Sequence, residues 1–279
     1  MSSAGPTRQS ASFSAGPSGS SFRIVSEPLH GDAIGTVIWA HAFAEEMNKT
    51  RRMCARLARL LAGRGWRVVQ RDLLGCGDSQ GELREATWEG WTDELVAEVF
   101  QADAARPAWL WGVRAGALFA PALVAARSDL NLLLWQPALN GSVVLQQFLR
   151  LHTGARVLGA ADRAQPTPAQ RLKQGEVVEV GGYELTAKLT AGLDRARLAV
   201  PAGYAGRVVW IEVSPTQPPM LSQLARDAAA QWRERGVPVQ QDVVHGPSFW
   251  QTQEIAECPA LIEATASIVR GWGAQPSMP

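Results

Sequence analysis

The sequence predicts an α/β fold in which helices cover both faces of a mostly parallel, doubly wound sheet. Short, continuously apolar runs alternate with amphipathic stretches along most of the chain, and the connections between them are short. Apolar runs without polar alternation are typical of strands that are buried on both faces. At 279 residues, of which 46% are hydrophobic, the chain is long enough to form one such domain with a large core.

The expected strands are the short apolar runs. The run at 36–40 reads Thr-Val-Ile-Trp-Ala and has no polar alternation, as expected for a fully buried strand. An edge strand is expected at 22–26, before a turn at 31–35. Further strands are expected at 66–70, 108–111, 132–135, 207–213 and 239–244.

The expected helices follow from apolar spacing and from their end signals. In 48–62, Met53, Leu57, Leu60 and Leu61 recur at helical spacing, and glycines at 63 and 65 end the stretch. Thr87 is a suitable N-cap for a helix over 87–101. In 115–127, Pro121 must lie near the first turn. The last two helices are expected at 221–235 and 254–272.

Two segments do not fit the alternation. Residues 1–21 are rich in Ser, Gly, Ala and Pro and have no continuous apolar core, so we expect a disordered N-terminal tail followed by one domain over 22–279. The pattern also loosens over about 136–202. We expect a cap insertion there, at the carboxyl side of the sheet, where ligands bind in such folds.

Composition excludes several functions. The net charge is +1, with 27 basic and 26 acidic residues and no block of like charge, which argues against nucleic-acid binding. Three widely spaced cysteines match neither a disulfide framework nor a metal site, and we expect no cofactor. No apolar run is long enough to span a bilayer. Three free thiols favour the reducing environment of the cytoplasm.

The strand at 108–111 leads directly into Gly112-Val113-Arg114-Ala115-Gly116 and then into an apolar helix. The G-x-S-x-G nucleophile elbow has this spacing and this strand–turn–helix context. Its glycines are required because the strained central residue brings strand and helix close together. Arg114 stands where the nucleophile normally stands. Taken alone, the segment is equally compatible with an ordinary glycine-containing turn.

Two further loops favour the elbow interpretation. The strand at 36–40 leads into His41-Ala42-Phe43, similar to the His-Gly-aromatic turn that lines the oxyanion hole of many hydrolases. The strand at 66–70 leads into the segment 72–79, which reads DLLGCGDS and resembles a D-x-x-G-x-G-x-S loop of the same fold. With these three loops in this order, the chain resembles members of the α/β-hydrolase superfamily.

The resemblance narrows further. The segments HAFAEEMNK (41–49), LGCGDS (74–79), LWGVRAGAL (110–118) and LLWQP (133–137) are together similar to the exosortase A system-associated hydrolases, more particularly the second type. GYEL (182–185) and SFWQT (248–252) fit the same pattern. The resemblance implies a role in bacteria that sort PEP-CTERM proteins and make exopolysaccharide. The family name also implies that the protein is a hydrolase.

The residues do not supply an ordinary Ser-Asp-His triad. The guanidinium of Arg114 stays protonated and cannot attack a carbonyl. The acid position, after the strand at 207–213, holds no carboxylate, and Glu212 is expected to face a neighbouring layer. Phe249 stands where the histidine belongs, and His245 lies four residues earlier at a strand end. Whether the protein is an enzyme therefore remains open at this point.

Arg114 needs a negative partner, because it stands at a helix N-terminus that already carries partial positive charge. Glu45 and Glu46, on the neighbouring strand-end loop, are the nearest candidates, and an anionic ligand is the alternative. We expect Phe43, Val113 and Phe249 to line the same pocket.

Cys76 is the remaining candidate nucleophile, with His41 as the histidine expected near it. His245 is a candidate base only if a shifted loop brings it to the site. It lies between two glycines at the carboxyl edge of the sheet, and Arg114 is a possible source of the positive charge that a thiolate needs. A small residue packed in a tight turn is the simpler interpretation.

Two functions thus compete. One is a hydrolase or acyl-transfer enzyme with a non-standard set of groups, and the other is a non-catalytic homologue that binds a ligand or a partner. The insertion mixes apolar and basic residues, which suits an amphipathic, acyl- or glycan-related small molecule and equally a plain packing helix. The oligomeric state is left open.

Overall fold

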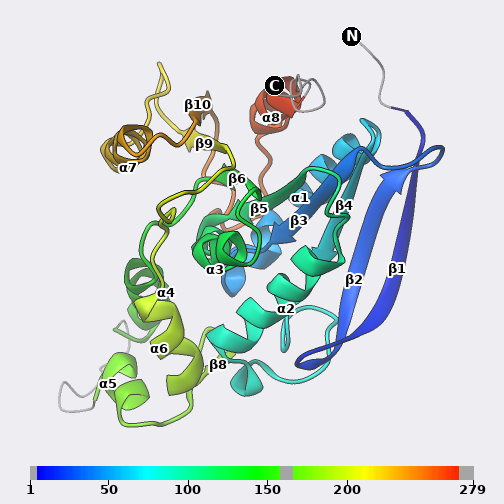
Figure 1. The fold of residues 1–279 in the computed structure, drawn as a ribbon. Coiled ribbons are helices and arrows are strands. Elements are labelled where there is room, and N and C mark those ends of the chain that lie inside the picture. The colour runs from blue at the N-terminus through cyan, green and yellow to red at the C-terminus, as the bar shows by residue number, and fades with distance from the viewer. Residues whose placement is uncertain (1–4, 158–165, 270–279) are drawn as a thin grey trace.

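The computed structural model describes residues 5–157 and 166–269, and the side chains of 151–157 are not described. Eight strands form one sheet in the order β1-β2-β4-β3-β5-β6-β9-β10 (Figure 1). The strands from β4 to β10 are parallel, while β1 and β2 form an antiparallel hairpin that joins the sheet through β4. Their bounds are β1 Thr7–Gly16, β2 Gly19–Pro28, β3 Gly35–Ala40, β4 Trp66–Arg71, β5 Ala108–Val113, β6 Asn131–Trp135, β9 Val208–Ser214 and β10 Val239–His245.

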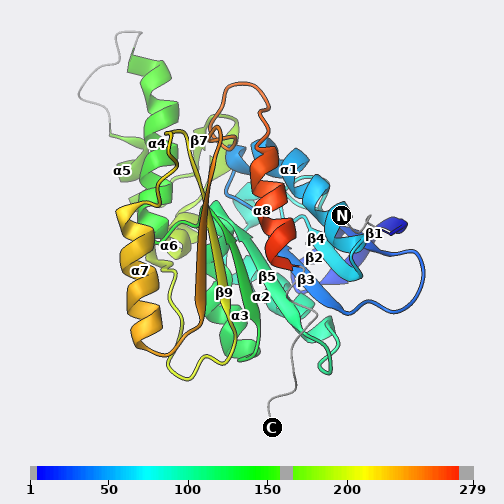
Figure 2. The ribbon, with the colours of Figure 1, turned by 90° about the horizontal axis from the view of Figure 1, so that it is seen from above.

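Helices cover both faces of this sheet (Figures 1 and 2). Two of them, α1 (Glu45–Ala62) and α8 (Pro259–Val269), contact each other, as do α2 (Trp88–Gln101) and α3 (Ala120–Ala126). A further helix, α7 (Gln223–Glu234), packs on β10. The core is unusually rich in indole rings, and seven are almost fully buried: Trp39, Trp66, Trp91, Trp109, Trp111, Trp135 and Trp210.

The expectation of a disordered tail over residues 1–21 is wrong for the described part of that segment. Residues 7–16 form β1, which pairs with β2 along its whole length, from Thr7 opposite Pro28 to Gly16 opposite Gly19. The expected edge strand at 22–26 is therefore an inner strand. Most side chains of β1 are exposed, so hydrophobic patterning could not reveal it. Backbone pairing with β2 holds the strand in place instead.

Several helix ends follow the sequence signals. Thr87 caps α2, with its Oγ1 accepting a hydrogen bond from Gly90 N at 2.9 Å. Pro121 lies in the first turn of α3, which follows the short 3₁₀ helix η2 (Arg114–Phe119). The helix expected from residue 254 begins only at Pro259. The residue before a proline is disfavoured in helical conformation, so Cys258 marks this start.

Between β6 and β9 the chain forms a separate group of elements at the carboxyl ends of the strands (Figures 1 and 2). They are α4 (Gly141–Val157), α5 (Pro168–Lys173), the short antiparallel pair β7 (Val178–Val180) and β8 (Tyr183–Leu185), and α6 (Ala187–Arg195). None of the helices in the described ranges is both long and apolar enough to cross a bilayer.

Candidate ligand site

The loops that follow β3, β5 and β6 meet at the carboxyl edge of the sheet, and each contains one strained residue. Among the described residues, three non-glycine residues have positive φ: Ala44 (49°), Arg114 (53°) and Gln136 (41°). Left-handed backbone at a residue with a side chain costs roughly 1–2 kcal/mol. Strain of this kind concentrates at functional sites, where the surrounding structure holds it in place.

Arg114 has the backbone conformation of an elbow residue. A Cβ atom on Gly116 would overlap the carbonyl oxygen of Ala40, and one on Gly112 would lie 2.7 Å from the Cα of Ala117. Only glycine permits these approaches of strand and helix. The turn that normally exposes a nucleophile is thus fully formed around an arginine.

The guanidinium of Arg114 is held by three neighbours. Its Nε and Nη2 lie 3.1 Å from Glu46 Oε2 and Oε1 respectively, which makes a two-pronged ion pair. Its Nη1 donates to the backbone oxygen of Gln136 at 3.3 Å. Its Cζ lies 5.1 Å from the centroid of the Trp250 ring, within cation–π range. Of the two glutamates proposed from the sequence, Glu46 is the partner.

A cleft of about 520 Å³ is lined by Glu46 of this pair but not by Arg114 itself, and we call it the α4 cleft. One wall is α4, another is the loop after β3 with the first turn of α1, and the third is the segment after β10. Phe43 and Phe148 meet edge to face across it, with ring centroids 5.5 Å apart. Its lining consists of Phe43, Glu45, Glu46, Lys49, Val144, Gln147, Phe148, Arg150, Trp250 and Gln251.

The charges at the rim of the cleft are mostly paired. Tyr183 Oη donates to Glu45 Oε2 at 3.1 Å, and Asn48 Nδ2 donates to Tyr183 Oη at 3.0 Å. Burial, followed by the charge of Glu45, raises the pKa of Tyr183. Lys49 Nζ lies 3.6 Å from Glu45 Oε1. Arg150 is exposed and forms no ion pair within the described residues.

Cys76 does not have the environment of a nucleophile. Burial raises the pKa of its thiol, and the charges of Asp72 and Glu94 raise it further. The cation among its neighbours is Arg51 rather than Arg114, and Arg51 is already paired with Asp72 at 3.0 Å. Arg114 is not among the groups that shift the pKa of Cys76.

Neither candidate base reaches the cleft. His41 is buried, and burial lowers its pKa, so its neutral ring donates from Nδ1 to the Ala42 carbonyl oxygen at 2.8 Å. Its ring packs near Trp91, with centroids 6.0 Å apart. His245 is exposed at the end of β10 and is not part of the cleft lining.

The remaining predicted positions lie outside the lining of the cleft. Val113 is buried in β5, and Phe249 is buried with its ring centroid 5.2 Å from that of Trp250, so neither lines the cleft. Glu212 faces away, as expected, and accepts hydrogen bonds from the backbone N and Oγ of Ser222 at 2.6 and 2.9 Å at the start of α7.

Two contributors were missed from the sequence. Gln136 supplies the carbonyl oxygen that receives Arg114, and Trp250 supplies the ring beneath its guanidinium. Gln136 follows a buried strand and precedes a proline, which signals a constrained strand end. Trp250 lies in the SFWQT segment that fits the family pattern, but nothing in that segment indicates that its ring packs on Arg114.

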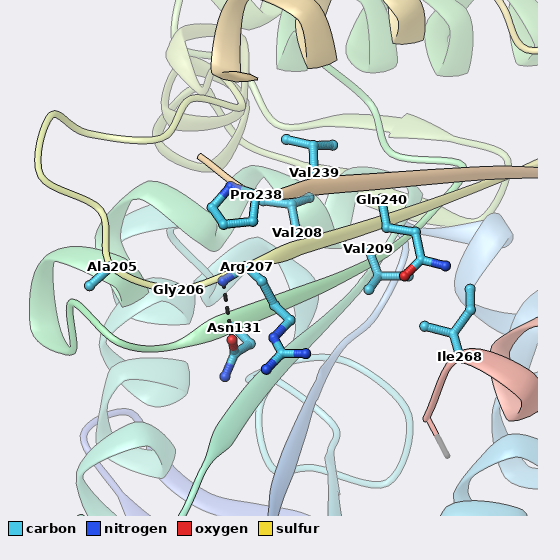
Figure 3. Close-up of a pocket in the computed structure, with 10 residues that line it drawn as sticks. All are labelled: Asn131, Ala205, Gly206, Arg207, Val208, Val209, Pro238, Val239, Gln240 and Ile268. Atoms are coloured by element: carbon cyan, nitrogen blue, oxygen red, sulfur yellow. Dashed lines mark hydrogen bonds between the residues drawn. The ribbon is translucent and has the colours of Figure 1, made fainter. Parts of the chain in front are cut away.

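A second cavity, of about 570 Å³, lies at the opposite end of the sheet (Figure 3). It is built around the amino ends of β9 and β10, where the Arg207 backbone N donates to Asn131 Oδ1 at 3.1 Å. Ligands in open α/β sheets bind at the carboxyl ends of the strands. Arg207 is its one charged lining residue, and the Cζ atom of Arg207 lies 6.0 Å from the centroid of the Trp109 ring. We therefore assign the candidate site to the α4 cleft.

Comparison with known proteins supports the fold. No protein-family model matches the sequence, and no curated protein matches it. Among solved structures, an α/β hydrolase from Penicillium sp. sh18, GrgF, is similar with a TM-score of 0.60 and 13% identity, over 94% of this chain and 98% of that one. A carboxyl esterase from Bacillus coagulans has a TM-score of 0.60 and 12% identity, over 95% and 99%.

A serine hydrolase without a lid, from Xanthomonas campestris, has a TM-score of 0.53 and 19% identity, over 98% of both chains. At these identities the likeness concerns the fold. Together with the eight-stranded, mostly parallel sheet and the elbow at Arg114, it shows that this chain has the α/β-hydrolase fold.

Proposed function

We propose that this protein is a non-catalytic protein of α/β-hydrolase fold that binds a small amphipathic molecule in the α4 cleft. The observation that carries the proposal is Arg114 itself. It occupies the nucleophile position at a φ of 53° and is fixed to Glu46, rather than being free to react.

The lining of the cleft supports binding over catalysis. As far as the described residues extend, it contains no Ser, Thr, Cys or His, the side chains that act as nucleophile or base in acyl transfer. The permanently charged guanidinium of Arg114 cannot take either part. The three cysteines are all buried and free, which fits a reducing, cytoplasmic location.

The same lining suggests the kind of ligand. Phe43, Val144, Phe148 and Trp250 offer an apolar surface suited to an acyl or alkyl chain. Gln147 and Gln251 offer amide donors and acceptors suited to a hydroxyl-rich, sugar-like end, and the exposed cation Arg150 stands beside them.

The biological setting rests on the sequence resemblance. The segment 41–49 resembles the second type of exosortase A system-associated hydrolases, and its residues Phe43, Glu45, Glu46 and Lys49 form part of the cleft. A binding role within that exopolysaccharide-linked system is therefore part of the proposal.

Calorimetric titration with octyl glucoside and with octanoate, below their micellar concentrations, tests the proposal. We expect wild-type protein to bind at least one of them and Phe148→Ala to bind it about tenfold or more weakly, because truncation removes an aromatic wall. Leu224→Ala, at a 68% exposed position on α7, serves as the matched control and should bind like wild type. Failure of both probes, or equal binding by Phe148→Ala, would contradict the proposal.

A further inference from the structure

The strand β1 leaves an open edge on the sheet. It is ten residues long, pairs with β2 on one side, and has no further strand of the described chain on the other (Figure 1). In an antiparallel pair, alternate residues direct their N–H and C=O groups away from the partner. About half of the backbone groups of β1 therefore point toward the open edge.

This edge lacks the devices that usually prevent pairing. Proteins protect exposed edge strands with lysines, prolines, bulges or short length. Residues 7–16 contain no lysine and no proline, and the pairing with β2 runs without a bulge. The single charge, Arg8, lies near the start of the strand and is already paired with Glu27.

The sequence of β1 is self-complementary. Residues 11–15 read Ala-Ser-Phe-Ser-Ala, which is the same in both directions. If two copies pair antiparallel about a two-fold axis at Phe13, then Phe13 faces its own counterpart, Ser12 faces Ser14, and Ala11 faces Ala15. A two-fold interface of this kind presents the same surface from both subunits.

Phe13 has the exposure that such an axis needs. It is 64% exposed, and its ring lies 5.5 Å from that of Phe22 on the neighbouring strand. Aromatic pairs directly opposite each other stabilise antiparallel strands. In this register Arg8 falls opposite Ser18, so no like charges meet.

We propose that a second copy of this chain pairs with β1, giving a two-fold dimer with one continuous sheet through both subunits. The dimer goes beyond the ligand-binding role and is independent of it, because the α4 cleft is lined by the loop after β3, α1, α4 and the segment after β10, and by no residue of β1.

Sedimentation equilibrium over a wide concentration range tests the dimer. The mass of wild-type protein should rise from 30.1 kDa toward twice that value as concentration increases. Phe13→Lys should weaken association by about tenfold or more, because two lysines then face each other. Phe100→Lys, at a 71% exposed position on α2, should associate like wild type. A wild type that stays at 30.1 kDa, or a Phe13→Lys variant that dimerises normally, would overturn the proposal.

Charge reversal tests the register. An equimolar mixture of Phe13→Lys and Phe13→Glu should recover the dimer that neither forms alone, since opposite charges then meet at the axis. If circular dichroism shows that both variants are folded and the mixture still does not dimerise, the pairing about Phe13 is overturned.

If either variant is unfolded, hydrogen exchange of the wild-type protein tests the interface instead. The amides of β1 must then gain protection as concentration rises, and unchanged exchange would reject the edge as the interface.

Discussion

Arg114 retains a strained elbow conformation without the nucleophile that such a turn normally presents. The left-handed backbone costs roughly 1–2 kcal/mol. Arg114 is held by Glu46 through Nε and Nη2, by the Gln136 carbonyl oxygen through Nη1, and by the Trp250 ring. Because the side chains of Arg114 and Glu46 are only 12% and 21% exposed, solvent screens this pair weakly. These contacts hold the strained turn in place.

Glu46→Gln should destabilise the protein by about 1–3 kcal/mol, because it leaves the partly buried guanidinium of Arg114 without its counter-charge. Urea denaturation measures the change. Glu45→Gln is the matched control: Glu45 is 44% exposed and pairs with Lys49 at the rim, so its change should stay below about 0.5 kcal/mol. Equal losses in the two variants would show that Arg114 does not depend on Glu46.

His41 should make stability depend on pH. Burial lowers its pKa below the ordinary 6.5, so the unfolded chain takes up a proton at a higher pH than the folded chain does. The free energy of unfolding therefore falls as the pH drops below 6.5, down to the folded-state pKa. His41→Gln should flatten this part of the curve. A His41→Gln curve that is parallel to wild type would contradict the assignment.

At the scale of elements, buried charges attach the N-terminal hairpin to α2 and β4. Arg71 Nε donates to Glu98 Oε1 at 2.8 Å, and Arg71 Nη2 donates to Ser14 Oγ of β1 at 3.1 Å. Ser21 Oγ, in β2, donates to Glu94 Oε2 at 3.0 Å. Breaking a buried ion pair by removing one partner is costly, whereas forming it adds little. The network thus specifies where the hairpin lies.

Glu98→Gln should lower the free energy of unfolding by about 3 kcal/mol, because Arg71 is 1% exposed and would lose its closest negative partner. Glu89→Gln, in the same helix, removes a 63% exposed carboxylate paired with Arg195 and should change stability by less than about 0.5 kcal/mol. Chemical denaturation of both variants measures the difference. Similar values would mean that the Arg71 network contributes little.

The parallel strands and their helices could be predicted because burial on both faces leaves a continuous apolar run, as in 36–40. The strand β1 could not, since it is stabilised by backbone pairing and by contacts such as Ser14 with Arg71, neither of which leaves a hydrophobic pattern. The last helix begins at Pro259 rather than at residue 254, because the residue before a proline is disfavoured in helical conformation. The apolar spacing alone did not indicate this start.

At the scale of the whole molecule, strand order determined which parts of the site were predictable. Glu46 was identified as a partner candidate because β3 and β5 are neighbours, which brings their terminal loops together. Cys76 and His41 follow the ends of neighbouring strands too, yet both are buried away from the cleft lining. Side-chain direction and burial at a loop depend on packing across the whole fold, and a single sequence does not contain that information.

Ligand binding should stabilise the whole molecule. A ligand that binds only the folded state adds about 2.7 kcal/mol to the free energy of unfolding at 100 times its Kd. We therefore expect octyl glucoside or octanoate, whichever binds, to raise the melting temperature of wild-type protein and to have much less effect on Phe148→Ala at the same concentration. A shift of equal size in both proteins would indicate binding outside the α4 cleft.

The most direct test of the central claim is labelling with a fluorophosphonate probe, read by intact mass, on wild-type protein and on Arg114→Ser. If the elbow is non-catalytic, neither protein forms a stoichiometric adduct, because the described lining of the cleft holds no histidine, the base that normally activates a serine hydroxyl, even when serine stands at position 114. One adduct per chain on a serine of the wild-type protein, accompanied by turnover of short-chain nitrophenyl esters, would contradict the account.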